Sequence, residues 1–166
     1  MSQVEDELAI RQLAAAYTDA CNCRSAEGMA GGYAPDGELM TAGRDRPIKG
    51  YDKLLIGFQR LLEQREFLMQ TTHSGVVEVR GDTAVARWWF TELKKPVGHP
   101  NYQYVWGCYQ DELVRLPVGW RYARRTAAGM FTRELPVSEG QAGPPAFLPM
   151  PSLPGREAEA AALKAG

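Results

Sequence analysis

Two helical segments come before a run of long strand-like segments in this chain, and that order constrains the fold more than any other feature. The first helical segment has one apolar face, formed by Ile10, Leu13, Ala14, Tyr17 and Cys21. A second amphipathic helix is predicted for 51–64, and strands are predicted for 67–79, 83–93, 102–116 and 119–131. We therefore expect an α+β fold: a cone-shaped barrel in which a curved antiparallel sheet is closed by about three N-terminal helices, with a pocket between them.

The segment between the two long helices carries cap and turn residues. Ser25 is placed to cap a short helix that ends near Gly31. Pro35-Asp36-Gly37 has the composition of a turn, and it precedes a predicted short strand, 38–42. A loop, 43–47, then leads to the second long helix.

The hairpin signal Gly81-Asp82 predicts which side chains share a face of the sheet. A two-residue loop there pairs His73 with Phe90, Gly75 with Trp88, and Val77 with Ala86. Alternation then places His73 on an otherwise apolar face, together with Trp88 and Phe90. We therefore expect this imidazole to lie inside the pocket. Because Trp89 lies on the opposite face, we expect that face to be covered as well, by a second subunit.

Composition and charge limit the class of protein. The chain has 166 residues, which is enough for one domain with a substantial core. A net charge of −1 gives no field that favours nucleic acid or an anionic membrane surface. No apolar run is long enough to span a membrane, and the acidic N-terminus does not resemble a secretory signal. Three cysteines do not make a disulfide framework, so we expect a cytoplasmic protein with reduced thiols.

Several kinds of functional site find no support in the sequence. It has no glycine-rich phosphate loop and no dinucleotide fingerprint. Cys21-x-Cys23 lacks the spacing of redox and zinc motifs, and two distant histidines give no metal signature. No nucleophile motif surrounds a serine. We therefore predict a protein that uses no metal or other cofactor.

The composition changes after Leu135, where prolines become frequent and hydrophobic periodicity ends. We expect a domain that covers 1–135, followed by an extended tail, 136–166, with a short terminal helix near 157–164. The tail could form a strap over a neighbouring subunit or over the mouth of the pocket, or it could be disordered.

A series of short motifs carries a resemblance to a known family. In chain order they are Ile10-Arg11-Gln12-Leu13 through Tyr17, Tyr33-Ala34-Pro35-Asp36-Gly37, Ile48-Lys49-Gly50-Tyr51, Thr72-His73, Val77-Glu78-Val79 with Gly81-Asp82-Thr83-Ala84, Asp111-Glu112-Leu113-Val114-Arg115, and Gly119-Trp120-Arg121. In this order and spacing, residues 5–132 resemble the nuclear transport factor 2-like superfamily, in its SnoaL-like branch. The resemblance implies the cone fold more specifically than a reaction, because one fold hosts many functions.

The resemblance also implies a set of catalytic residues. Enzymes of the scytalone dehydratase and hexachlorocyclohexane dehydrochlorinase type use an Asp–His dyad as a base, assisted by an arginine at the pocket. Matched by position, the histidine falls on His73, the arginine on Arg125, and the aspartate on Asn22. Asparagine can orient an imidazole but cannot stabilise an imidazolium by charge. Asp19 and Glu38 are the carboxylates that could take its place.

Other side chains could line the pocket. Alternation from Trp120 places Arg124 with the aromatic residues of its strand, but a bulge would place Arg125 there instead, so either arginine could face inward. Tyr102 and Tyr104 share a strand face with Trp106, which suits either a pocket for a flat ligand or ordinary core packing. The residues that we expect to bind substrate are Tyr17, Tyr33, Trp88, Phe90, Tyr102 and Tyr104.

These expectations combine into one leading hypothesis and two alternatives. The leading hypothesis is a lyase or isomerase, of dehydratase or cyclase type, that acts on a hydrophobic small molecule. His73 would transfer the proton, Asn22 or Asp19 would orient it, and Tyr17 or an inward arginine would stabilise charge on oxygen. The alternatives are a protein that binds a hydrophobic ligand without turnover, and a structural β-type subunit of an oxygenase. We expect a homodimer without nucleic-acid or membrane partners.

Overall fold

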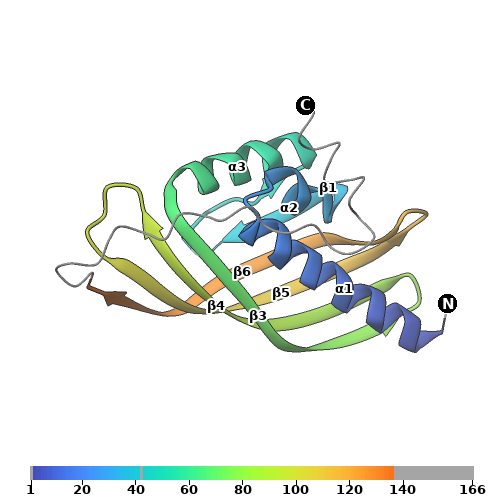
Figure 1. Cartoon of the computed structure of the whole chain (residues 1–166). Helices are drawn as coiled ribbons and strands as arrows, with labels where there is room; N and C mark the ends of the chain where they lie inside the picture. The colour runs from blue at the N-terminus through green and yellow to red at the C-terminus, as the bar shows by residue number, and fades with distance from the viewer. Residues whose placement is uncertain (1, 42, 137–166) are drawn as a thin grey trace, which may run out of the picture.

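The computed structural model describes residues 2–41 and 43–136. In that part of the chain, the helices α1 (Gln3–Asn22), α2 (Ala26–Gly31) and α3 (Tyr51–Glu63) lie on one side of a six-stranded sheet. The strands are β1 (Tyr33–Thr41), β2 (Ile48–Lys49), β3 (Arg65–Arg80), β4 (Thr83–Pro96), β5 (Tyr102–Leu116) and β6 (Gly119–Leu135). The sheet curves around the helices without closing on itself (Figure 1). The α+β cone expected from the sequence is therefore confirmed.

The strands follow the order β2-β1-β6-β5-β4-β3. Every neighbouring pair is antiparallel except β1 and β6, which run parallel in this part of the chain. Strand β1 already begins at Tyr33, so the turn predicted at 35–37 is wrong, and this segment is an irregular stretch inside the strand. Gly37 allows this course, because a Cβ there would lie 2.7 Å from the carbonyl oxygen of Tyr122.

The helices α1 and α3 form where the apolar spacing predicts them, and α2 forms where a cap residue predicts it. Helix α1 begins with a capping box, in which Ser2 and Glu5 each accept a hydrogen bond from the backbone of the other. Ser25 caps α2 as predicted, because its hydroxyl accepts from the Gly28 amide at 3.0 Å. The inner face of α1 is buried at Ile10, Ala14, Tyr17 and Cys21. None of the helices among residues 2–41 and 43–136 is long and apolar enough to cross a membrane.

A bulge in β3 changes the face on which His73 lies. Thr72 pairs with Phe90 and Gly75 with Trp88, so two residues, His73 and Ser74, stand opposite one residue of β4. The predicted pairing of His73 with Phe90 is therefore wrong, whereas the pairs nearer the turn, Gly75–Trp88 and Val77–Ala86, are confirmed. Because a bulge adds one residue, it reverses the alternation of the residues that follow.

A second bulge, in β6, decides which arginine faces the helices. Glu112 pairs with Arg124 and Leu113 with Tyr122, so Ala123 is the additional residue. Both Tyr122 and Arg125 are consequently buried, while Arg124 is half-buried on the other face. The inward arginine is Arg125.

Asp6 fastens the start of α1 to the hairpin of β5 and β6. The residue is 3% exposed, and its carboxylate accepts hydrogen bonds from Arg115 Nη2 at 2.6 Å and Trp120 Nε1 at 3.1 Å. The hydrogen bond from Arg115, together with the one from Trp120, holds the pKa of Asp6 below its usual value of 3.8.

The proline-rich segment 137–166, including the expected strap and terminal helix, lies outside the described residues. The same holds for Ala42, the predicted end of the short strand.

Replacing Asp6 by Asn should lower the free energy of unfolding at neutral pH. Because folding lowers the Asp6 pKa, the carboxylate stabilises the fold above pH 3.8, and this contribution disappears as the pH falls through the folded-state pKa. Urea unfolding of the natural protein and the D6N variant between pH 7 and pH 3 should therefore show a difference that shrinks at the acid end. A difference that stays constant over this range would contradict the assignment.

Candidate functional site

Arg125 lies at the centre of the buried interior and is 1% exposed. Its Nε and Nη2 atoms donate to the two carboxylate oxygens of Asp111 on β5, each at 2.8 Å. Trp88 on β4 donates from Nε1 to the same carboxylate at 3.0 Å. These hydrogen bonds compensate both charges for the loss of water, which a buried ion pair requires.

Aromatic rings enclose the guanidinium group. Its central carbon lies 4.4, 4.2 and 4.0 Å from the ring centres of Tyr17, Tyr109 and Tyr122, distances at which the ring faces attract a cation. Tyr33 and Phe58 pack on these rings. We call the five residues Tyr17, Tyr33, Phe58, Tyr109 and Tyr122 the aromatic cluster. Its members come from α1, β1, α3, β5 and β6, and their ring centres lie 5.3 to 6.4 Å apart.

Three polar atoms at this centre have no hydrogen-bond partner among the described residues: Tyr33 Oη, Tyr122 Oη and Arg125 Nη1. Burial raises the pKa of both phenols, so they are protonated at neutral pH and can donate. Leaving a buried donor unpaired costs about 1–3 kcal/mol, so the arrangement favours a bound molecule that supplies an acceptor oxygen.

A second polar group lies beside the aromatic cluster. The side-chain amide of Gln70 donates to Tyr109 Oη at 2.8 Å and to the Glu92 carboxylate at 3.3 Å. Glu92 also pairs with Lys94 at 3.0 Å. Glu92 lies two residues after the buried Phe90 on β4, so alternation places its carboxylate on the inner side of the sheet. Burial, and then the charge of Glu92, raise the pKa of Cys21 to about 12. Sequence reasoning missed Glu92, although the alternation that turns Trp88 and Phe90 inward also applies to it.

His73 does not join this interior. Its ring is exposed and stacks on that of Trp106 with centres 6.0 Å apart, and Nε2 lies 3.1 Å from the hydroxyl of Thr91. Thr91 and Trp106 pair across the sheet on the face away from the helices, because their neighbours Phe90 and Gly107 occupy the inner face. The predicted interior position of His73 is therefore wrong, and the β3 bulge is the reason.

The predicted dyad partners of His73 have other contacts. Asn22 donates to the Gln70 carbonyl at 2.8 Å and accepts from the Gln70 amide at 2.7 Å, so it joins the end of α1 to β3. Asp19 is exposed, and Glu38 pairs with Lys49 at 3.0 Å. Among residues 2–41 and 43–136, no hydrogen bond or ion pair connects Asn22, Asp19 or Glu38 to His73.

The structure divides the predicted substrate-binding residues between the two faces. Those that are buried on the inner face are Tyr17, Tyr33, Trp88 and Phe90. Tyr102 and Tyr104 share a face with Trp106 as predicted, but it is the outer face, since Tyr104 pairs with Leu93 and Trp106 with Thr91.

The cluster around Arg125 is thus the candidate site. In the described part of the chain, no grouping of His, Cys, Asp and Glu residues could hold a metal ion.

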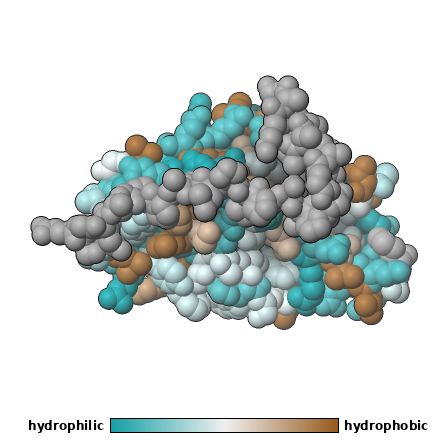
Figure 2. Space-filling model, viewed as in Figure 1, coloured by the Kyte–Doolittle hydropathy of each residue, from teal (hydrophilic) through white to brown (hydrophobic). Residues whose placement is uncertain are grey.

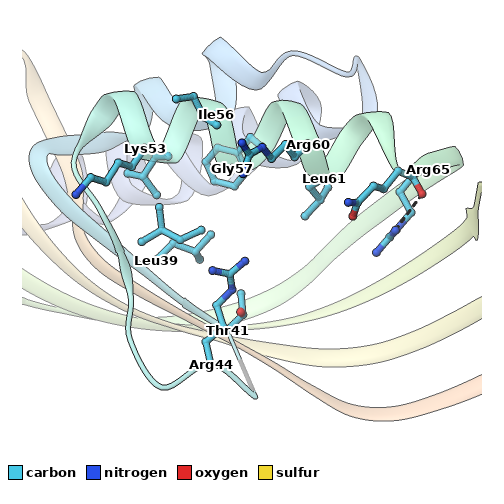
Figure 3. Close-up of a pocket in the computed structure, with 13 residues that line it drawn as sticks. Leu39, Thr41, Arg44, Lys53, Ile56, Gly57, Arg60, Leu61 and Arg65 are labelled. Carbon is cyan, nitrogen blue, oxygen red and sulfur yellow. Dashed lines mark hydrogen bonds between the residues drawn. The ribbon is translucent and has the colours of Figure 1, made fainter.

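A cleft of about 620 Å³ lies between α3 and the β1–β2 hairpin (Figure 3). Leu39, Leu54 and Phe58 are among its apolar lining residues. Leu39 pairs with Arg125 across β1 and β6, and Phe58 belongs to the aromatic cluster. Leu39 and Phe58 therefore lie between the cleft and the candidate site.

The model of the SnoaL-like domain matches residues 2–126, and so covers most of the chain. The chain belongs to the SnoaL-like domain family. A comparison with curated proteins gives no significant match for this SnoaL-like protein.

Solved structures of the same fold include two proteins from Novosphingobium aromaticivorans. One, provisionally named an aromatic ring hydroxylase, is 21% identical, with 81% of this chain and 96% of that chain covered and a TM-score of 0.73. The other, provisionally named a scytalone dehydratase, is 17% identical, with 84% and 96% covered and a TM-score of 0.72. The hexachlorocyclohexane dehydrochlorinase LinA type 2 is 16% identical, with 87% and 97% covered and a TM-score of 0.76. At such identities the likeness establishes the fold alone.

Removing one partner of the buried ion pair should destabilise this SnoaL-like protein strongly. Arg125→Met leaves Asp111 as an uncompensated buried charge, and Asp111→Leu does the same to Arg125, so we expect each to cost about 3–5 kcal/mol of unfolding free energy. The double variant leaves neither charge behind and should lose much less than the sum of the two. Urea unfolding of the three variants measures this coupling, and additive losses would contradict it.

Proposed function

We propose that this protein is a cofactor-independent lyase or isomerase whose substrate presents an oxygen atom to Arg125. The main observation that supports this proposal is a set of buried donors without a hydrogen-bond partner: Tyr33 Oη, Tyr122 Oη and Arg125 Nη1. They belong to one region, because the Tyr33 and Tyr122 ring centres lie 5.3 Å apart and Arg125 lies 4.0 Å from the latter. A substrate oxygen would give all three donors a partner.

Such donors suit a reaction in which negative charge develops on oxygen. Removal of a proton from the carbon next to a carbonyl group forms an enolate, which can then lose a leaving group from the adjacent carbon or be protonated elsewhere. Oriented donors in a dry interior stabilise the developing oxyanion without any cost of reorganisation at the moment of reaction. The raised pKa values of the phenols keep them as donors throughout.

We propose Glu92 as the general base. Its carboxylate faces the interior and is linked through Gln70 to Tyr109, whose ring centre lies 4.2 Å from Arg125. The family resemblance assigns this role to His73, and that assignment stays a prediction. It requires an imidazole on the outer face to reach the interior, whereas Glu92 is already on the inner side.

Access to the donors requires Phe58 or Leu39 to move, because these side chains separate the cleft from Arg125. Such a movement would also exclude water when the side chain closes behind the substrate. The named activities of two proteins with the same fold, a dehydratase and a dehydrochlorinase, are eliminations, which supports the reaction class.

Hydrogen–deuterium exchange at carbon tests the proposal before the natural substrate is known. A panel of small aromatic and alicyclic ketones, incubated with the protein in D₂O and followed by NMR and mass spectrometry, should include compounds that exchange or eliminate. For these, Tyr122→Phe should lower the rate about 10²–10³-fold, because it removes one oxyanion donor and keeps the ring. Tyr51→Phe, on an exposed tyrosine of α3, is the matched control.

The variants Glu92→Gln and His73→Gln distinguish the two bases. We expect the first to abolish exchange and the second to leave it close to that of the natural protein. The reverse result would restore the histidine mechanism. A Tyr122→Phe variant with an unchanged rate would refute the oxyanion site itself.

Ligand binding without turnover is the second candidate. It is favoured by Asn22, which holds Gln70 by two hydrogen bonds and leaves the family's dyad incomplete. Saturable binding of the same panel, with no exchange and no product for any compound, would support this candidate. The third alternative, an oxygenase subunit, requires a larger catalytic partner.

We further propose that a second copy of this chain covers the outer face of the sheet. Large apolar side chains gather there on adjacent strands, with Trp89 42% and Trp106 48% exposed. The same face carries charges of both signs, such as Arg87 on β4 and Glu112 on β5. A surface that carries both signs can pair with itself across a two-fold axis.

Light scattering coupled to gel filtration should therefore give the mass of a dimer. Trp89→Glu places an uncompensated charge in the proposed interface and should yield monomers. Val118→Glu, at the exposed tip of the β5–β6 hairpin, is the control and should remain dimeric. A monomeric natural protein, or a W89E variant that stays dimeric, would rule out this interface.

A further inference from the structure

We infer that the cleft beside α3 selects substrates with an apolar body and an anionic oxygen group, such as a carboxylate. The inference rests on the proposed function in one respect: the cleft leads to the candidate site past Leu39 and Phe58. It adds the class of substrate, which the Arg125 site alone does not define.

Four cationic side chains line the cleft: Arg44, Lys53, Arg60 and Arg65. Within the described part of the chain, no acidic residue lines it. The ion pairs formed among residues 2–41 and 43–136 include none of these four side chains. Because the whole chain has a net charge of −1, this local charge is not part of a general excess. The cleft therefore carries a positive potential that an anionic ligand would neutralise.

The cations approach the cleft from two sides. Figure 3 shows Arg44 extending from the β1–β2 connection towards α3, while Lys53 and Arg60 come from the helix itself. Lys53 and Arg60 are seven residues apart and so lie on the same side of α3. Arg65 begins β3, one residue beyond the C-cap Gln64 of the helix. In the space-filling view, hydrophilic residues gather over α3, with isolated hydrophobic ones among them (Figure 2).

Guanidinium groups recognise carboxylate and phosphate oxygens through paired hydrogen bonds, with a geometry that lysine does not offer. Arg65 already donates from Nη1 to the carbonyl of Gln64 at 3.0 Å, so one of its nitrogens is engaged. Arg44 and Arg60, on opposite sides of the cleft, are therefore the principal anion ligands that we assign.

The apolar part of the cleft lining favours a ligand with an apolar body. It includes Leu39, Ile48, Leu54, Phe58 and Leu61. A volume of about 620 Å³ lies within the range of sites for small organic molecules. A molecule with a ring or short chain would bury its apolar part against these side chains and keep its anionic group at the cationic rim. The inferred ligand is thus an amphipathic organic acid.

Isothermal titration with 2-naphthoate and its neutral analogue 2-naphthalenemethanol tests the inference. The natural protein should bind the acid about tenfold or more tightly than the alcohol, and the preference should decline at high salt. The double variant Arg44→Gln/Arg60→Gln should weaken binding of the acid about tenfold and leave binding of the alcohol within twofold. Arg46→Gln removes an exposed arginine of the same connection that does not line the cleft, and it should change neither affinity.

Equal affinity of the natural protein for the acid and the alcohol would overturn the inference, and so would unchanged binding of the acid by the double variant. Absence of binding by the acid would overturn it as well. Because titration measures binding without turnover, it can refute the inferred anion selection without refuting the proposed reaction. Anion-selective binding without carbon exchange would refute only the reaction, and exchange of acids and neutral ketones at equal rates would refute only the selection.

Discussion

The ion pair between Arg125 and Asp111 is the interaction on which the interior depends. The two residues stand directly opposite each other on β5 and β6, so their hydrogen bonds exist only in one register of these strands. Trp88 extends the arrangement to β4 through the same carboxylate. A shift of either strand by one residue would move one charge to the outer face and leave the other buried alone, at a cost of several kcal/mol. The pair therefore favours one pairing of three strands over its alternatives.

The same pair also explains why tyrosines, rather than leucines, surround it. A guanidinium group has five N–H donors in a plane, and Asp111 accepts only those of Nε and Nη2. Ring faces attract the cation without competing for the carboxylate, although they give Nη1 no hydrogen bond. The phenol hydroxyls introduce further polar atoms into an otherwise apolar core. The aromatic cluster takes one ring from each of five elements, so it exists only when the fold is complete. Such a site therefore forms only when distant segments of the chain have packed together, and not within one local segment.

Sequence reasoning succeeded where one physical signal dominates and failed where a single additional residue changes its phase. Apolar periodicity located the helices α1 and α3, and the pairs Gly75–Trp88 and Val77–Ala86 followed from the turn alone. Beyond the bulges, alternation gave the wrong face for His73 and no decision between Arg124 and Arg125, because a bulge has no reliable sequence signature. The cleft could not be foreseen either, since Arg44 and Arg60 are distant in sequence and meet only after the connection folds beside α3.

The bulge at His73 and Ser74 has an implication for how this family can diversify. With the hairpin turn in place, loss of Thr72 would remove the bulge, set His73 opposite Phe90 and turn its imidazole from the solvent side to the helix side, whereas loss of Ser74 would leave it on the solvent side. A deletion of three nucleotides can therefore exchange a surface histidine for an interior one, without any substitution of the residue itself. The length of one strand thus decides on which side of the sheet this imidazole lies.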